Sequence, residues 1–180
     1  TLFHRHPPRV PDDELALDMQ DYIQSELARA GLRHYEVSAY AQPQHECQHN
    51  TNYWQFGDYI GIGAGAHGKI SQHDRIGRTA RFKHPQRYLD AVAQGNAVET
   101  EQMLTRAELP FEYMLNALRL RDGTTLAQMQ MASGLSVVDL EPALSQAQVK
   151  GLMVKEAERL CVTDLGWRFL SDVQTLFLND

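Results

Sequence analysis

Cysteine is scarce in this sequence, and long apolar runs are missing. Only Cys47 and Cys161 occur among the 180 residues, which excludes a disulfide framework and favours a reducing cytoplasm. No stretch is long and apolar enough to span a membrane, and the first residues lack the apolar segment of a signal peptide. The chain starts at Thr1 rather than at methionine, so we expect it to begin partway into a longer protein.

The composition is that of a soluble globular protein. Hydrophobic residues make up 43% of the chain and charged residues 22%, and the length allows one good core or a core with a small appendage. The net charge of −6 argues against general affinity for nucleic acids. We therefore expect a cytoplasmic protein with no integral membrane segment and no nucleic-acid partner.

The first 70 residues alternate helix and strand signals, as α/β folds do. Asp12 or Asp13 can cap a helix that ends at Gly31, and its apolar residues recur at four-residue spacing (Leu15, Met19, Ile23 and Leu27). Residues 35–41 alternate like a strand, and residues 58–65 resemble a buried strand that ends in glycines. We predict the last units of a parallel sheet or barrel, whose strand ends form the active face.

The character of the sequence changes near residue 100. A basic stretch (69–87) and a short helix opened by Pro85 and stopped by Gly95 come before this point. After it we predict an amphipathic helix around Met114, a helix capped by Thr125, a helix around Leu144, two short strands in 153–162 and a final helix capped by Thr163. This order is typical of winged-helix domains. We therefore predict domains at 1–99 and 100–180.

The run His49-Asn50-Thr51-Asn52-Tyr53-Trp54 is the strongest candidate site in the sequence. It combines an imidazole, amides and two large aromatic rings within six residues. Imidazole can ligate iron, the rings can stack on a flat macrocycle, and the amides can hold its polar edges. The alternative is that Tyr53 and Trp54 are half-buried packing residues and that His49 is a hydrogen-bonded loop residue.

Three neighbouring patterns suggest further sites, each with a plainer explanation. His45-x-Cys47-x-His49 places two imidazoles and a thiol together, but a structural zinc site usually requires four ligands. The glycines of 61–68 let a ligand approach the backbone, or they mark a tight end to a strand. The basic stretch 69–87 can bind carboxylates or phosphates, or it is a solvated face.

The order of the winged-helix-like segment also raises the possibility of a DNA-binding regulator. Residues 109–180 carry six lysine and arginine residues against nine aspartate and glutamate residues. The helix in the recognition position, 140–150, has Lys150 as its one basic residue. Such a surface is a poor phosphate binder, so we expect a packing or lid role instead.

Several motifs occur together in one order and spacing, and they extend over nearly the whole chain. They are Ser38-Ala39-Tyr40-Ala41 with Pro43, His49-Asn50-x-x-Tyr53-Trp54, Asp58-Tyr59-Ile60-Gly61-Ile62-Gly63-Ala64-Gly65-Ala66-His67-Gly68, Arg78-Thr79, Pro85-x-x-Tyr88-Leu89 and Leu165-Gly166-x-x-Phe169-Leu170. The sequence thereby resembles the radical S-adenosylmethionine (SAM) family of oxygen-independent coproporphyrinogen III oxidase-like (HemN) proteins. Within that family it is most similar to the branch of HemW-like haem chaperones.

The resemblance implies an α/β fold: the C-terminal units of an incomplete radical-SAM (β/α) barrel, followed by a mostly α, winged-helix-like domain. In the family, a Cys-x-x-x-Cys-x-x-Cys motif holds a [4Fe–4S] cluster that cleaves SAM. That motif does not occur in this chain. The sequence therefore matches the C-terminal half of such a protein, which cannot hold the cluster or start radical chemistry by itself.

The resemblance also assigns residues to two ligands. Ala41, Ala66 and His67 match positions that line SAM, and His49 matches the histidine linked to haem binding, with Asn50, Tyr53 and Trp54 beside it. Arg78 or Arg81 can pair with haem propionates. These assignments imply a chaperone that delivers haem to haem proteins. The alternative is oxidative decarboxylation of coproporphyrinogen III to protoporphyrinogen IX, although the true oxidases resemble this sequence less in the 49–54 run.

Overall fold

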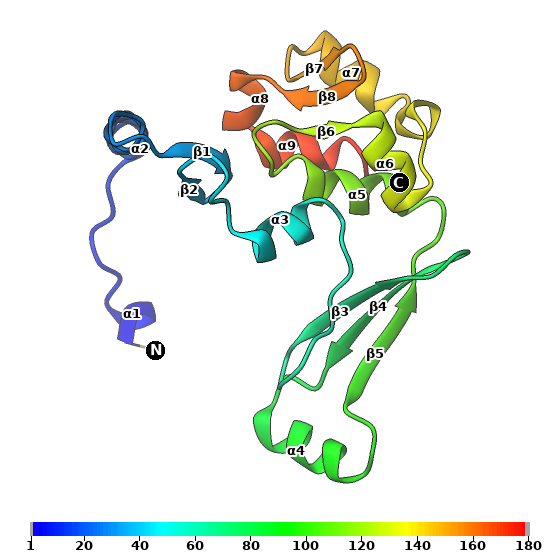
Figure 1. Cartoon of the computed structure of the whole chain (residues 1–180). Helices are drawn as coiled ribbons and strands as arrows, with labels where there is room; N and C mark the ends of the chain where they lie inside the picture. Colours follow the sequence, from blue (N-terminus) through cyan, green and yellow to red (C-terminus); the bar gives the residue numbers. More distant parts are fainter. Residues whose placement is uncertain (1, 179–180) are drawn as a thin grey trace. The chain divides into compact units, whose positions relative to one another are not determined.

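Two units of structure, Thr1–Glu46 and Cys47–Asp180, make up the chain, and each is described by itself. A computed structural model describes residues 2–178, without the side chains of Leu2 and His4 (Figure 1). Within these residues we find no helix that is long and apolar enough to cross a membrane.

The first unit consists of two helices and a hairpin. Its elements are α1 (Leu2–Arg5), α2 (Asp13–Arg29), β1 (Arg33–Glu36) and β2 (Ala39–Ala41). The carboxylate of Asp12 accepts a hydrogen bond from the N–H of Leu15 at 2.9 Å, and Gly31 has a φ of +77°, so both predicted ends of the long helix are confirmed. None of the residues of α2 is buried, and its apolar side chains stay largely exposed.

The single strand predicted over residues 35–41 is wrong. The chain turns at Val37 and Ser38, and β1 and β2 pair with each other in antiparallel fashion. The rings of His34 and Tyr40 stack across this pair, with centroids 4.4 Å apart. Alternation of apolar and polar residues occurs in both arrangements, so it could not distinguish one strand from two short ones.

The second unit contains a three-stranded sheet. Its strands are β3 (His67–Ser71), β4 (Ile76–Arg81) and β5 (Val98–Met103), paired in the order β3-β4-β5, with α4 (Pro85–Ala93) between β4 and β5. As predicted, α4 begins at Pro85 and ends just before Gly95. The sheet is long and narrow, and α4 lies at one end of it (Figure 1).

A helical module with a second small sheet completes this unit. Its elements are α3 (Gln48–Trp54), α5 (Leu109–Ala117), β6 (Thr124–Thr125), α6 (Leu126–Ser133), the 3₁₀ helix η1 (Val137–Leu140), α7 (Ala143–Val149), β7 (Met153–Glu156), β8 (Arg159–Val162), α8 (Asp164–Arg168) and α9 (Leu170–Thr175). Its three strands pair in the order β6-β8-β7. The predicted cap at Thr125 is confirmed by a capping box with Gln128, and the predicted hairpin is β7–β8. The final helix divides at Phe169 into α8 and α9.

The main hydrophobic core lies in this helical module. Its largest fully buried side chains include Tyr113, Met114, Leu118, Met129, Leu135, Leu140, Leu144, Met153, Leu160 and Val173. Phe56, which follows α3, joins the same core, and the centroids of its ring and the Tyr113 ring are 5.4 Å apart. Arg78 on β4 forms an ion pair with Glu112 on α5, so the sheet is tied to the module by charge as well.

The parallel sheet predicted for the first 70 residues does not form. Every strand pairing within residues 2–178 is antiparallel. The predicted domain boundary near residue 100 falls inside β5, whereas the two units divide after Glu46. The domain assignment and the winged-helix character of the C-terminal part stay predictions.

The buried strand predicted over residues 58–65 is wrong as well. Only Tyr59 pairs there, in an isolated antiparallel bridge with Lys69, and Ile60 and Ile62 are 73% and 84% exposed. Gly63 and Gly65 have φ values of +108° and +73°, which an extended strand does not allow. The segment 59–66 is therefore a loop, called here the glycine loop, and the strand begins after it at His67.

Truncation in the core should destabilise this unit strongly. Leu118 is fully buried, so Leu118→Ala removes buried methyl groups and leaves a cavity, and we expect it to lower the free energy of unfolding by about 2–5 kcal/mol. Leu89→Ala, at a side chain that is 58% exposed, is the matched control and should cost less than about 1 kcal/mol. Urea denaturation measures both, and equal losses would contradict the position of the core.

The close packing of the glycine loop on β3 gives a second prediction. A Cβ at Gly61 would lie 2.2 Å from the carbonyl oxygen of His67, whereas a Cβ at Gly77 would meet only the flexible end of Met103, at 3.3 Å. Gly61→Ala should therefore lower the free energy of unfolding by about 1–3 kcal/mol and expose the amide of Lys69 to hydrogen exchange. Gly77→Ala should do neither. Unchanged protection in Gly61→Ala would show that the loop does not rest on the strand.

Candidate functional site

The run His49–Trp54 lies on a helix rather than in a loop, which corrects the sequence prediction. It fills most of α3 (Gln48–Trp54), whose first turn is closed by a hydrogen bond from the N–H of Thr51 to the carbonyl of Cys47 at 2.9 Å. The helix ends at Gln55, and Phe56 follows with a φ of +63°. A helix places residues four positions apart on the same face, so the geometry of the site differs from that of an extended loop.

His49 and Tyr53 lie on one face of α3. They are one turn apart, and their rings meet edge to face with centroids 4.7 Å apart. Tyr59 from the glycine loop lies behind Tyr53, with ring centroids 4.3 Å apart. The imidazole of His49 is exposed, whereas both tyrosines are half-buried. The predicted imidazole and the predicted aromatic ring are therefore brought together, and a third ring supports them.

Trp54 and Asn52 serve largely in packing. The guanidinium of Arg119, just beyond α5, lies 4.1 Å from the centre of the Trp54 ring. This cation–π contact joins α3 to the segment after α5. The side-chain amide of Asn52 donates a hydrogen bond to the carbonyl of Asp58 at 3.0 Å. Asn50 is half-buried. The plainer explanation given for the aromatic pair thus applies to Trp54, while Tyr53 remains beside His49.

A buried lysine joins the end of α3 to the sheet. The ammonium of Lys69 donates hydrogen bonds to the carbonyl of Phe56, the carboxylate of Asp58 and the hydroxyl of Ser71, each at 2.9 Å. It also lies 4.2 Å from the centre of the Phe56 ring. We call Lys69, Phe56, Asp58 and Ser71 the lysine clamp.

Opposing effects set the protonation of the lysine clamp. Burial lowers the pKa of Lys69, and the hydrogen bond and charge of Asp58 offset this only in part. For Asp58, partial burial acts to raise the pKa, but hydrogen bonds from the N–H of Ser71 and from Lys69 outweigh it, so the pKa lies below its usual value. Asp58 is therefore a carboxylate near neutral pH, whereas Lys69 loses its proton more readily than an exposed lysine does.

Two arginines suggested for propionates already have partners in the structure. Arg78 forms an ion pair with Glu112, and its guanidinium approaches the hydroxyl of Tyr59 at 3.5 Å. Arg81 donates from its Nε to the carbonyl of Gly61 at 3.2 Å, which holds the glycine loop. Pairing with a propionate therefore requires Arg78 to share its charge with Glu112.

The three residues assigned to SAM fall into both units. Ala41 ends β2 in the first unit and is buried. Ala66 and His67 belong to the second unit, where the carbonyl of Ala66 accepts a hydrogen bond from the N–H of Arg81 at 2.8 Å and His67 begins β3. Ala66 and His67 thus close the glycine loop, and its main chain is held by contacts on β4.

The metal site suggested by His45-x-Cys47-x-His49 does not form. Among the described residues, we find no group of three or more histidine, cysteine, aspartate or glutamate side chains placed to hold a metal ion. The suggestion assumed an extended backbone, whereas His49 lies in α3. Cys47 and Cys161 are not joined in a disulfide. Two thiols do not fit a [4Fe–4S] cluster held by three closely spaced cysteines.

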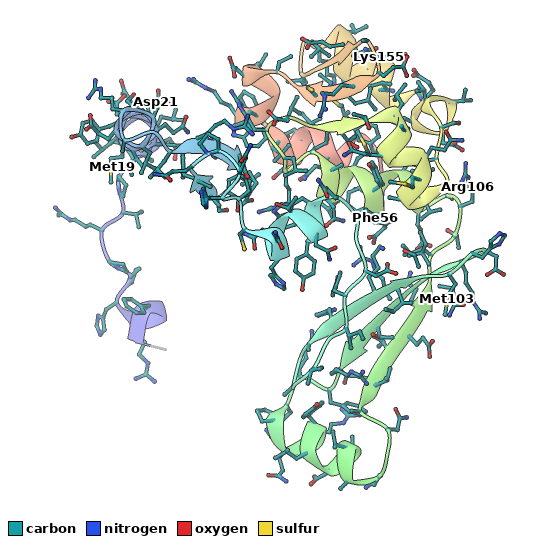
Figure 2. The ribbon with its side chains drawn as sticks, viewed as in Figure 1. Met19, Asp21, Phe56, Met103, Arg106 and Lys155 are labelled. Carbon is teal, nitrogen blue, oxygen red and sulfur yellow. The ribbon has the colours of Figure 1, made fainter. Side chains whose placement is uncertain are left out.

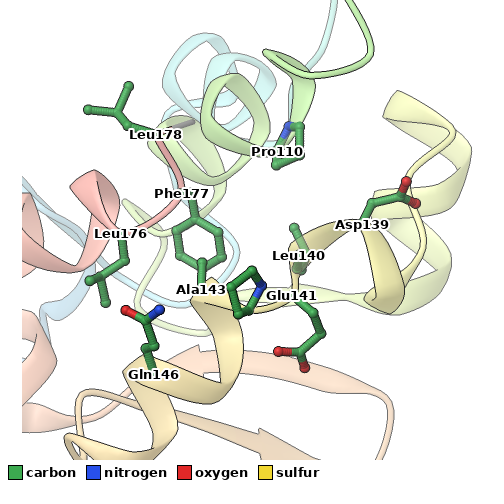
Figure 3. A pocket seen from close by; sticks show the side chains of 10 residues that line it. Pro110, Asp139, Leu140, Glu141, Ala143, Gln146, Leu176, Phe177 and Leu178 are labelled. Atoms are coloured by element: carbon green, nitrogen blue, oxygen red, sulfur yellow. The ribbon is translucent and has the colours of Figure 1, made fainter. Parts of the chain in front are cut away.

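A cavity of about 320 Å³ lies elsewhere in the helical module (Figure 3). Its lining comes from the start of α5, from η1 and α7, and from the end of the chain, and consists of Pro110, Asp139, Leu140, Glu141, Pro142, Ala143, Gln146, Leu176, Phe177 and Leu178. Asp139 is held by Arg106 at 2.7 Å. None of the residues predicted to bind haem or SAM lines this cavity.

Sequence reasoning missed the parts played by Lys69 and Tyr59. The sequence pattern places Tyr59 in a buried strand and Lys69 among the charges of a basic stretch. One signal was present. Lys69 directly follows a run of glycine and alanine that ends in His67-Gly68, and the next lysine or arginine is Arg75. The partners of Lys69, 11 and 13 positions earlier in the chain, could not be identified without the fold.

The chain is similar to several known proteins. A model of the HemN C-terminal domain family matches residues 104–169. "Heme chaperone HemW" of Escherichia coli (strain K12) is 38% identical over all of this chain, which covers 47% of that protein. "Heme chaperone HemW" of Haemophilus influenzae is 34% identical over the whole chain and 46% of its own length, and that of Mycobacterium tuberculosis (strain H37Rv) is 34% identical over 93% of the chain and 40% of its own length.

A solved structure has a similar fold. It is coproporphyrinogen III oxidase (HemN) from Escherichia coli, a radical SAM enzyme, with a TM-score of 0.68 and 18% sequence identity over 93% of this chain and 42% of that one. This likeness shows the mixed α/β fold alone. The chain spans about half the length of the curated relatives that it matches. The motifs and these relatives agree: the chain matches the C-terminal portion of proteins of the HemW-like branch of the HemN family.

Proposed function

We propose that this chain supplies the haem-ligating segment of a haem chaperone, which binds haem and delivers it to haem proteins. The observation that carries the proposal is the exposed imidazole of His49, set edge to face against Tyr53 on α3. A neutral imidazole ligates haem iron through one ring nitrogen, and an exposed helical face leaves room for a flat macrocycle. Three relatives are each named as a heme chaperone, which supports haem as the cargo.

The surroundings of His49 suit such a cargo. Tyr53 supplies an aromatic edge beside the ligand, and Tyr59 keeps that ring in place. We propose Asn50 as a polar contact at the rim of the macrocycle and Trp54 as a neighbouring wall, although Trp54 is also engaged by Arg119. An exposed ligand suits a protein that must release haem to a recipient, because a deeply enclosed haem would leave slowly.

For the longer protein we propose SAM and a [4Fe–4S] cluster as cofactors, with the cluster bound outside this chain. The glycine loop supports a role at SAM: Gly61 brings main chain against main chain, and the loop ends at Ala66 and His67. Together with Ala41, these residues are our proposed SAM contacts. We also propose that residues 1–99 adjoin a radical-SAM barrel whose parallel strands come from the rest of the protein, and that the protein acts in the cytoplasm without nucleic acid.

Replacement of His49 should abolish specific haem ligation. Haemin is titrated into the full-length protein, and the Soret band is followed. Because the axial ligand is lost, His49→Ala should weaken binding at least about tenfold and shift the Soret maximum. His73→Ala, which removes another exposed histidine from the turn between β3 and β4, is the matched control and should bind as the wild type does. An unchanged Soret spectrum in His49→Ala would remove the basis of the proposal.

The alternative function, oxidation of coproporphyrinogen III to protoporphyrinogen IX, gives a separate prediction. The full-length protein, reconstituted with its cluster under anaerobic conditions and supplied with SAM, should form no protoporphyrinogen IX from coproporphyrinogen III. The oxidase of similar fold is the positive control. Product formation at a rate comparable to that control would place oxidation above haem delivery.

A further inference from the structure

Lys69 is a charged side chain in an unusual position. Its side chain is 2% exposed, although lysine is among the residues that are almost never fully buried unless they are paired. All three of its N–H donors have acceptors at 2.9 Å, from Phe56, Asp58 and Ser71. The carboxylate of Asp58 is 40% exposed, so the ion pair is buried on the lysine side only.

The side chain of Lys69 fixes the end of α3. Phe56 is the second residue after the helix, and both its carbonyl and its ring contact the ammonium. Phe56 also holds a left-handed backbone, with a φ of +63°, which is rare for a large residue and persists only when its surroundings enforce it. Figure 2 shows Phe56 just beyond α3. The lysine clamp therefore holds the chain directly after α3, at the point where the helix ends.

The main chain of Lys69 fixes Tyr59 at the same time. The N–H of each residue donates to the carbonyl of the other at 2.9 Å, which forms the isolated bridge between the glycine loop and β3. Tyr59 packs on Tyr53, and Tyr53 packs on His49. Lys69 thus contacts both the segment that ends the helix carrying the imidazole and the residue whose ring supports Tyr53.

The pKa of Lys69 shows how its burial affects the stability of the fold. Burial gives Lys69 a lower pKa in the folded protein than in the unfolded chain, so folding favours the uncharged amine. At pH values below the folded pKa the ammonium therefore costs stability, and this cost fades as pH rises through the folded pKa toward the unfolded pKa. A buried ion pair is weak evidence for stability and is better attested as a device that specifies geometry.

We propose that Lys69 is a positioning residue for haem ligation: it sets the orientation of the His49 imidazole through Phe56 on one side and through Tyr59 and Tyr53 on the other. This inference rests on the proposed haem site. Lys69 does not itself touch the cargo. Its removal should change how the imidazole meets the iron while leaving the chain folded.

The test uses the full-length protein, haemin as the probe and two variants of the lysine clamp. Lys69→Met keeps the length and the apolar stem but removes the ammonium, and Asp58→Asn weakens the clamp from its exposed side. We expect Lys69→Met to weaken haemin binding at least about tenfold and to shift and broaden the Soret band, with a smaller change of the same kind in Asp58→Asn. Lys155→Met is the matched control, because Lys155 is an exposed residue of β7, and this variant should behave as the wild type does.

Urea denaturation of the same variants distinguishes positioning from simple support. A midpoint close to that of the wild type, together with the altered Soret band, supports the proposal. An unaltered affinity and Soret maximum in both clamp variants would overturn it, and so would unfolding of both variants before haemin is added. If His49→Ala binds haemin as the wild type does, the haem site itself fails, and this result is independent of what Lys69 does.

Discussion

The burial of one ammonium group governs how the second unit is assembled. Lys69 lies in the first strand of the sheet, yet its side chain ends among groups that belong to the segment after α3. A cation can stay in such a place only if each of its donors finds an acceptor. The carbonyl of Phe56 and the carboxylate of Asp58 therefore have fixed positions, and the helix before them and the glycine loop after them must follow.

Local chemistry was enough to predict much of the fold. The capping box of Thr125 with Gln128, the start of α4 at Pro85 and the stop of α2 before Gly31 depend on neighbours within a few residues, and the structure has each of them. The hairpin β7–β8 belongs to the same group, because a short turn joins its strands. Within the candidate site, the sequence placed His49 and Tyr53 in one short motif, but their edge-to-face contact became visible only with the helix.

The failures have two physical causes: local turns that the composition does not reveal, and contacts between residues distant in sequence. The composition of residues 58–65 fits a buried strand, and only the turns at Gly63 and Gly65 leave it an exposed loop. The run from His49 to Trp54 contains asparagine and threonine, which are poor helix formers, so α3 owes its helical state to packing by Trp54 and Phe56. The placement of Lys69 likewise became visible only with the fold.

Phe56 belongs to two structures at once, and this has a consequence for cargo. Its ring is part of the core formed by α5–α9, while its carbonyl receives the ammonium of Lys69. The helix that carries the imidazole can therefore be ordered only when the core behind it has formed. If the chain ligates haem as proposed, a nascent or damaged copy would present no preformed ligand face, and only the folded protein would accept haem. A ligand that binds only the folded state also stabilises that state by mass action, so haem binding and folding would be coupled.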